Sequence, residues 1–106
     1  GSEMCIRDRY GVMRRYQITD PTKVDEILRR ADKELAPLIK QAPGFCIYTV
    51  IDAGNGIIVS LNVFETKSGA EESTRLGAGW VKDNLAQYVE GPPVVTSGQI
   101  TYRKAR

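Results

Sequence analysis

The chain has 106 residues, enough for one small domain, and its 15 Lys and Arg residues nearly balance 13 Asp and Glu residues. The net charge of +2 is too small to indicate binding to nucleic acid or to an anionic membrane. The sequence holds no His, which excludes a His general base, a His-ligated haem and a Ser-His-Asp triad, and two Cys residues alone cannot form the usual zinc sites. There is no apolar run of membrane-spanning length and no signal-peptide pattern, so we expect a soluble cytoplasmic protein that holds no metal or cofactor.

Residues 1–9 do not have the pattern of a strand or a helix. Gly1 and Ser2 are typical of a cloning scar, and the letters SEMCIRDR resemble a sequencing adapter translated at the end of a gene assembled from metagenomic reads. We expect residues 1–9 to be non-native or a poorly ordered arm, and we assign a single domain to residues 10–106. Cys5 belongs to the arm, whereas Cys46 lies in an apolar strand, where Cys usually acts as a small hydrophobic residue.

From Tyr10 onward the sequence predicts strands and helices in alternation. A strand at Tyr10–Ile18 is followed by a helix that begins at Asp20 and Pro21, bends near Pro37 and ends before Gly44. Two strands then form a hairpin, at Phe45–Asp52 and Ile57–Glu65. The second helix begins with a capping box of Ser68 and Glu71 and runs to about Tyr88, and the last strand covers Val94–Lys104.

This βαββαβ order is that of a ferredoxin-like α+β fold, with two helices on one face of a four-stranded antiparallel sheet. If the hairpin turn is centred on Gly54 and Asn55, Ile51 faces Ile58. One face of the hairpin then carries Phe45, Ile47, Thr49, Ile51, Ile58, Ser60, Asn62 and Phe64, and the other carries Cys46, Tyr48, Val50, Val59, Leu61 and Val63. Both faces are largely apolar, so a second sheet must cover the one that the helices leave open. We therefore predict a homodimer through the sheet face.

The chain from Tyr10 to about Lys104 resembles the dimeric α+β barrel superfamily, and within it the antibiotic-biosynthesis-monooxygenase-like domains. The resemblance is carried by the stretches YGVMRRYQI, QAPGFCIYTVIDAG, SLNVFETKSGAEEST and PPVVTSGQI. It implies a pocket between the sheet and the helices and, in part of the superfamily, cofactor-free oxidation of polycyclic phenols. Another branch degrades haem with a His ligand on the second helix. Because the chain has no His, that branch would need an unusual ligand such as Tyr88.

Candidate site residues lie in the strands and on the second helix. Asn62 is an amide in the middle of a strand, and Trp80 has a flat ring that can stack on an aromatic substrate or anchor the core. Gly77 leaves room either for a ligand or for close packing. Arg14 and Arg15 are adjacent in a strand and must point to opposite faces, so at least one is buried. It should pair with Glu65 or Asp52, or bind an anionic ligand.

We assign catalytic roles to Asn62, Trp80 and Arg15, and substrate binding to Tyr48, Ser60, Phe64, Gly77 and Arg14. Two functions are consistent with these residues. The first is a cofactor-independent monooxygenase of a small phenol- or quinol-like aromatic, in which an arginine stabilises the substrate anion. The second is a non-catalytic barrel that is structural or binds a small hydrophobic ligand. An enclosed cavity with converging Asn, Arg and Tyr side chains would favour the enzyme.

Overall fold

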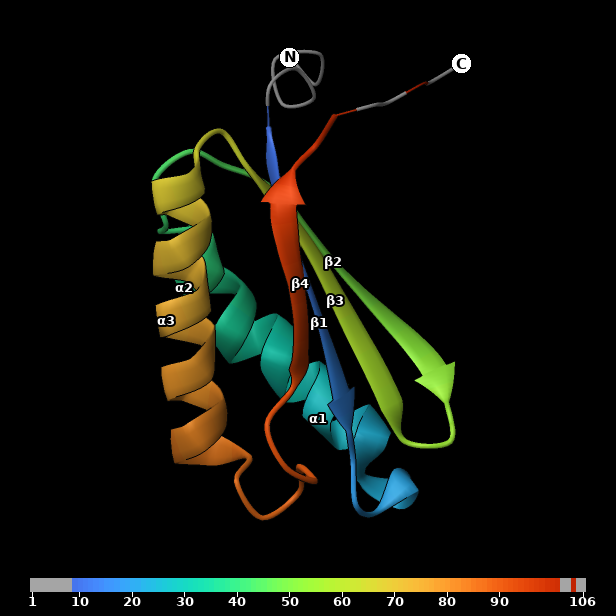
Figure 1. The fold of residues 1–106 in the computed structure, drawn as a ribbon. Helices are drawn as coiled ribbons and strands as arrows, with labels where there is room; N and C mark the ends of the chain where they lie inside the picture. The colour runs from blue at the N-terminus through green and yellow to red at the C-terminus, as the bar shows by residue number, and fades with distance from the viewer. Residues whose placement is uncertain (1–8, 102–103, 105–106) are drawn as a thin grey trace.

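A computed structural model describes residues 9–101 and 104 of the chain, so residues 1–8 of the expected arm, including Cys5, lie outside the described part. A four-stranded sheet has its helices on one face only (Figure 1). In chain order the elements are β1 (Tyr10–Gln17), a 3-10 turn (Pro21–Lys23), α1 (Val24–Arg30), a π-helical turn (Ala31–Leu35), α2 (Ala36–Ile39), β2 (Phe45–Gly54), β3 (Ile57–Phe64), α3 (Lys67–Asn84) and β4 (Val94–Gln99). The strand order β2-β3-β1-β4, with all neighbours antiparallel, confirms the predicted ferredoxin-like fold.

The first helical segment begins where the sequence indicates. The Asp20 side chain accepts a hydrogen bond from the backbone N–H of Thr22 at 3.0 Å, and Pro21 follows as the first helical residue. The expected bend near Pro37 takes the form of the π-helical turn Ala31–Leu35, directly before α2. Pro37 has no N–H to donate to the preceding turn, which accounts for this local change in the helix.

The predicted capping box of α3 is wrong. The N-cap is Thr66, whose hydroxyl accepts from the backbone N–H of Gly69 at 3.2 Å. Gly69 cannot be replaced by a larger residue without movement, because a Cβ there would lie 2.0 Å from the carbonyl oxygen of Pro43. The helix ends at Asn84, four residues before the expected end at Tyr88, and a turn leads on to an isolated bridge between Ile18 and Val89.

The predicted hairpin register is also wrong over most of its length. The turn residues are Asn55 and Gly56, both with positive φ as a type I′ turn requires, and not Gly54 and Asn55. This turn alone would shift the pairing by two residues and keep the predicted faces, but the irregularity between Asp52 and Gly54 shifts it back by one, and a second irregularity lies between Phe45 and Ile47. As a result Tyr48 pairs with Asn62, and Val50 pairs with Ser60. Tyr48 and Val50 therefore lie on the same face as their partners, and not on the opposite face as predicted. The other face carries Ile47, Thr49 and Ile51 together with Val59 and Leu61.

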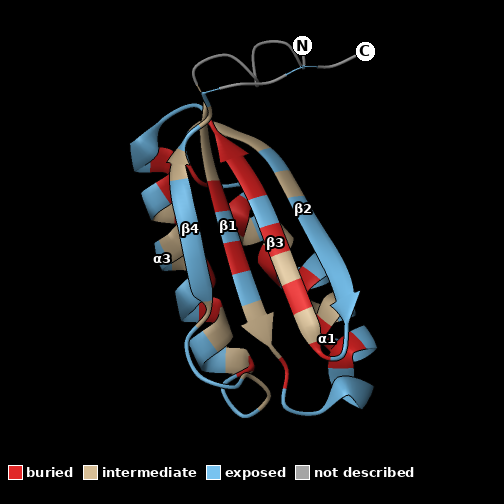
Figure 2. Cartoon of the chain, turned by 45° about the vertical axis from the view of Figure 1, so that its right-hand side comes forward, coloured by how far each residue is buried: buried red, intermediate tan, exposed pale blue. Residues whose placement is uncertain are grey.

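Burial follows these two faces (Figure 2). The inner face packs on the helices, and its core includes Val12, Ile18, Ile58, Phe64 and Trp80. The outer face is uncovered in the single chain and exposes large apolar side chains, namely Met13, Ile47, Ile51, Leu61 and Val94. Strands β2 and β4 form the two edges of the sheet. Of the helices in the described part of the chain, none is long and apolar enough to cross a membrane.

Candidate functional site

A small cavity of about 50 Å³ lies between the inner face of the sheet and the helices. Most of its wall is aliphatic, and its polar groups come from three neighbouring strands. They are contributed by Arg14 and Tyr16 of β1, Tyr48 of β2, and Ser60 and Asn62 of β3. The helices contribute Trp80 and Gly77 to the opposite wall. The site is therefore an apolar space with polar groups gathered on the sheet side, as small-molecule sites usually are.

Arg14 carries the charge of this site. Its side chain is buried, with 4% exposure, and its Nη2 donates to Thr74 Oγ1 at 2.6 Å and to Ser73 Oγ at 3.4 Å, both on α3. Its Nε is buried without a hydrogen-bond partner. Among the described residues, no carboxylate forms an ion pair with it, so the predicted pairing with Glu65 or Asp52 is not found. A buried cation that lacks a counter-ion is costly, and it attracts an anion strongly.

Asn62 lies beside Arg14 and is almost fully buried, with 1% exposure. With the amide oxygen turned towards Arg14, that oxygen accepts from Nη1 at 3.0 Å and the amide nitrogen donates to the Leu61 carbonyl oxygen at 3.1 Å. This orientation satisfies both ends of the amide. Asn62 therefore holds the guanidinium from the sheet side, while Thr74 holds it from the helix side.

Burial sets the charge state of the three titratable groups in the cavity. Desolvation raises the pKa of Tyr48 to about 12 and also raises the pKa of Tyr16, so both phenols are neutral at physiological pH. Burial lowers the pKa of Arg14, and the two tyrosines oppose that shift. Since a guanidinium starts far above neutral pH, Arg14 stays charged. The cavity thus holds one fixed positive charge beside two neutral hydroxyl groups.

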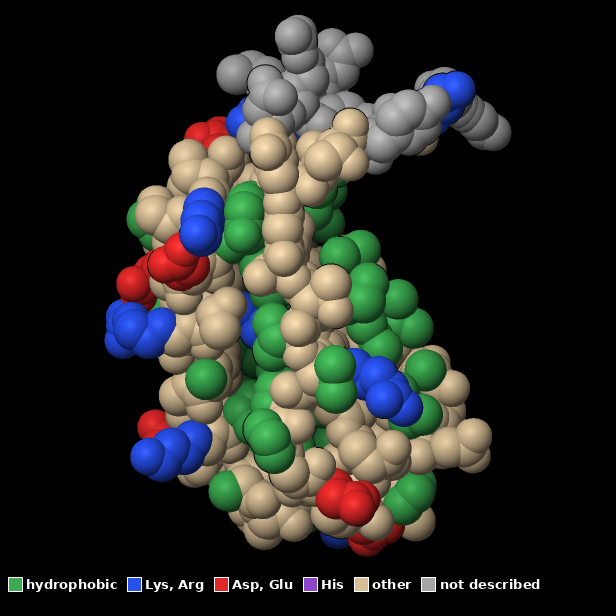
Figure 3. Space-filling view, viewed as in Figure 1, with side chains coloured by type: hydrophobic (Ala, Val, Ile, Leu, Met, Phe, Trp, Pro, Cys, Tyr) green, Lys and Arg blue, Asp and Glu red, His purple; other side chains and the backbone are tan. Residues whose placement is uncertain are grey.

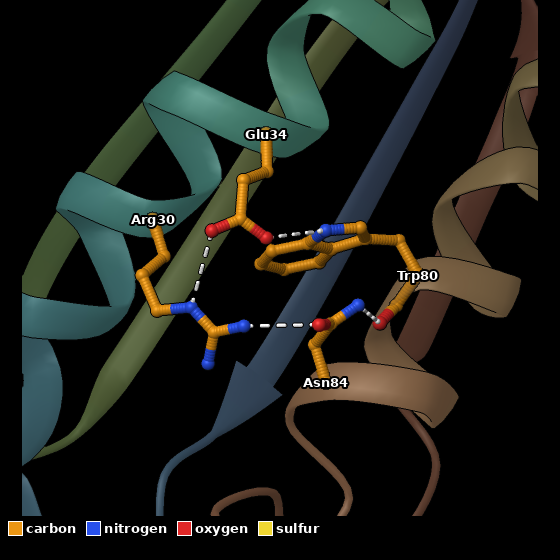
Figure 4. A network of polar contacts seen from close by, with 4 residues as sticks. All are labelled: Arg30, Glu34, Trp80 and Asn84. Atoms are coloured by element: carbon orange, nitrogen blue, oxygen red, sulfur yellow. Dashed lines mark hydrogen bonds and ion pairs between the residues drawn. The ribbon is translucent and has the colours of Figure 1, made fainter.

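Trp80 is fixed by a polar network between α3 and the first helical segment (Figure 4). Its indole nitrogen donates to Glu34 Oε1 at 3.3 Å, and the Arg30 guanidinium lies 5.7 Å from the ring centroid. Arg30 also contacts Glu34 Oε2 at 3.4 Å and donates to Asn84 Oδ1 at 2.9 Å. Asn84 in turn donates to the Trp80 backbone carbonyl at 2.9 Å. The network holds the Trp80 ring in the wall of the cavity. The indole N–H already donates its hydrogen bond to Glu34.

The structure gathers most, but not all, of the residues that the sequence singled out. Six of them line the cavity, namely Arg14, Tyr48, Ser60, Asn62, Gly77 and Trp80. Phe64 is fully buried and packs edge-on against Phe45 with centroids 6.0 Å apart, and it is absent from the cavity wall. Arg15 is exposed on the outer face, opposite Val59 and Val94, so it cannot act in this cavity. The buried arginine is Arg14.

Several residues of the site were not singled out from the sequence. Ser73 and Thr74 are two adjacent hydroxyl residues one turn before Gly77 on α3, and only their position opposite Arg14 gives them a role. Glu34 lies four residues after Arg30, which is the spacing of a helical ion pair, but its bond to Trp80 spans 46 residues. In the part of the chain that the structure describes, no group of three or more His, Cys, Asp or Glu side chains could hold a metal ion.

A larger groove of about 550 Å³ adjoins the cavity between α3 and the edge strand β4. Figure 3 shows this hollow, with hydrophobic side chains along it. Arg14, Tyr16, Val81 and Val89 line both spaces. The groove therefore reaches the same guanidinium from the solvent side, and a ligand too large for the cavity can extend into it.

Known structures with the same fold support the architecture. No protein-family model matches the sequence, and no curated protein matches it. A monooxygenase from the gene ActVA-Orf6 of Streptomyces coelicolor, solved with the ligand nanaomycin D, aligns over 94% of each chain with a TM-score of 0.69 and 16% identity. A dimeric ferredoxin-like protein from an uncultured marine organism aligns over 100% of this chain and 99% of its own, with a TM-score of 0.74 and 14% identity.

A third structure, from Nitrosomonas europaea, is provisionally described as an antibiotic biosynthesis monooxygenase. The alignment covers 92% of this chain and 95% of the chain from that structure, with a TM-score of 0.73 and 14% identity. Identities this low establish a common fold and leave the reaction open. The resemblance noted in the sequence is confirmed at that level: the chain has the ferredoxin-like α+β fold of structures described as antibiotic biosynthesis monooxygenases.

Proposed function

We propose that this protein is a cofactor-independent monooxygenase that oxidises a small phenol- or quinol-like aromatic with molecular oxygen. The observation that supports this most is the buried guanidinium of Arg14, which faces an apolar cavity and forms no ion pair with a carboxylate among the described residues. Such a charge favours the anion of a bound phenol and opposes the rise in its pKa that burial causes. The anion reacts with oxygen more readily than the neutral form.

The other side chains of the cavity have binding roles in this proposal. Asn62 holds Arg14 in place, and the neutral hydroxyl group of Tyr48 donates a hydrogen bond to the substrate oxygen. Trp80 stacks against the aromatic ring. The sequence has no His, and no Asp or Glu of the described residues lines the cavity, so in this proposal the phenol proton leaves to water.

The substrate itself supplies the electrons in this reaction. A ring carbon that carries two hydrogens in the keto tautomer becomes a carbonyl, one oxygen atom of O₂ is retained there, and the other leaves as water. The four electrons gained by O₂ balance the four lost by that carbon. The protein binds the anion, orients it and excludes bulk water.

We also propose that two copies of the chain pack through their outer sheet faces. Met13, Ile51, Leu61 and Val94 are 43%, 48%, 37% and 61% exposed in the single chain, and large apolar side chains exposed on one sheet face are typical of an interface. Arg15 lies on the same face, beside Val94. The marine protein with the same fold is described as dimeric. Two-fold packing would close this face and leave the cavity and the groove on the far side of each sheet.

The size of the cavity favours a second candidate, a barrel that binds a ligand without turning it over or that is only structural. About 50 Å³ holds a few water molecules and is smaller than an aromatic ring. Arg14 and Asn62 also satisfy much of each other's bonding capacity, as expected of a structural pair. The unpartnered Nε of Arg14 and the adjoining groove are what favour the enzyme.

Oxygen uptake separates the two candidates. The purified protein is incubated in air with a panel of phenols and hydroquinones, without added metal or flavin, against a boiled control. We expect uptake with at least one class, abolished in Asn62→Ala and Trp80→Phe and retained in Arg15→Met, which alters only the outer face. Absence of uptake across the panel, or uptake that survives both cavity substitutions, would contradict the proposed site.

A further inference from the structure

The groove between α3 and β4 has a charge pattern that the proposed reaction does not use. It exists because α3 packs over β1 and β3, while β4 lies beyond the helix at the edge of the sheet. Its walls are mainly small or apolar and are formed by Ala78, Val81, Ala86, Val89, Pro92, Pro93 and Val95. Among the residues that the structure describes, no Asp or Glu lines the groove, and the two charged residues that do are both cations. They are Arg14, which is buried, and Lys82, which is exposed.

The two cations stand at opposite ends of one row of side chains. One side of α3 carries Thr74, Ala78 and Lys82, which follow each other at intervals of four residues. Thr74 is the residue that accepts the hydrogen bond from Arg14. Eight residues of helix span about 12 Å along the helix axis, so the backbone of Lys82 lies about two turns from Thr74. Within the described residues, no ion pair occupies Lys82.

We propose that the groove binds the distal half of an aromatic hydroxy acid of at least two fused rings. Its hydroxyl lies at Arg14 and its carboxylate at Lys82, with the rings against the apolar wall. This inference rests on the proposed function for the role of Arg14 and adds a substrate class and a specificity-determining residue, Lys82. Two cations without any lining carboxylate select an anion and disfavour neutral or cationic aromatics.

Calorimetric titration with two matched probes tests this inference without any turnover. The probes are 2-naphthol and 6-hydroxy-2-naphthoate, which differ only by the carboxylate. We expect the unaltered protein to bind the naphthoate about two- to fivefold more tightly, as one partly exposed ion pair allows, and the preference to shrink as salt is added. Lys82→Gln should abolish the preference, whereas Lys33→Gln, which removes an exposed lysine outside the groove, should retain it.

Each other outcome overturns a stated part of the inference. Equal affinities in the unaltered protein would remove the carboxylate from the substrate class, and a preference that survives Lys82→Gln would remove Lys82 from the site. Binding of neither probe would show that the groove does not accept aromatic hydroxy acids. Oxygen uptake is measured separately, so an intact Lys82-dependent preference without oxidation would overturn the proposed oxygenase and leave the binding site standing.

Discussion

The indole nitrogen of Trp80 donates a hydrogen bond to Glu34 at 3.3 Å and so ties α3 to the π-helical turn before α2. The bond holds the ring at the wall of the cavity, and a substitution of Glu34 removes it without altering the ring itself. Trp80 is also the single tryptophan of the sequence, so its fluorescence reports this site alone.

Replacing Glu34 with Ala should loosen the ring. We expect the free energy of unfolding to fall by about 1 kcal/mol, the usual contribution of one hydrogen bond, and the fluorescence maximum to move to longer wavelength as water reaches the indole. Denaturant unfolding and an emission spectrum measure both effects. Glu26→Ala, which removes an exposed carboxylate of α1, is the control and should change neither. An unchanged spectrum in Glu34→Ala would mean that packing alone positions the ring.

Replacing Arg14 with Met should separate stability from binding. The substitution removes a buried charge that forms no ion pair among the described residues, and Ser73 and Thr74 keep their bonds to the Ala70 carbonyl. It also takes the Nη1 donor from the buried amide oxygen of Asn62. Because these two effects oppose each other, we expect the free energy of unfolding to change by no more than about 1 kcal/mol, and phenol binding to be lost. Arg15→Met on the outer face should keep phenol binding. A loss of more than about 2 kcal/mol in Arg14→Met would identify the guanidinium as a structural contact.

The stability of the protein should fall in alkaline solution because of Tyr48. Its pKa is raised to about 12 in the folded state, above the ordinary tyrosine value of about 10, so the unfolded chain loses the proton first as the pH rises. The stabilisation is complete below pH 10 and is lost between about pH 10 and 12. Unfolding by denaturant at a series of pH values measures this slope. Tyr48→Phe should flatten this slope, and so should Tyr16→Phe, because burial also raises the pKa of Tyr16.

Disruption of the outer sheet face should separate the proposed dimer. Leu61→Lys places a charge at the centre of the apolar face, opposite Met13, where a partner sheet would have to bury it. We expect sedimentation equilibrium to give twice the mass of the chain for the unaltered protein and a single chain for the variant. Glu26→Lys, a charge change on the helix side, should remain dimeric. A mass of one chain for the unaltered protein would contradict the proposed interface.

The two glycines around Ala78 should respond differently to a methyl group. A Cβ at Gly79 would meet nothing within 4 Å, so Gly79→Ala should raise the free energy of unfolding by roughly 0.5–1 kcal/mol through helix propensity alone. A Cβ at Gly77 would lie 3.7 Å from Ile39 Cδ1, an ordinary contact, but it would project beside the cavity. Gly77→Ala should therefore keep the stability and weaken phenol binding. Equal binding in both variants would show that Gly77 serves packing only.

The order of the elements was predictable because it depends on local pattern. Asp20 and Pro21 begin the first helical segment, and alternating residues mark β1 and β3 in both the sequence and the structure. Where the pattern offered two close alternatives, the prediction failed. Ser68 and Thr66 are both good N-caps, and the geometry around Gly69 and the Pro43 carbonyl selects Thr66. The hairpin offered turns at Gly54-Asn55 and at Asn55-Gly56, and the pairing of Gly54 with Ile57 in the sheet selects the second.

By itself the sequence determined the fold class, the two apolar faces of the sheet and the need for one buried arginine, since each of these follows from periodicity and composition. Only the tertiary structure decided that this arginine is Arg14, that Tyr48 shares the face of Asn62, and that Glu34 meets Trp80. The physical reason is that a strand alternates with a period of two. One extra residue at a bulge, as between Asp52 and Gly54, therefore moves every following side chain to the opposite face, and contacts between distant segments depend on that register.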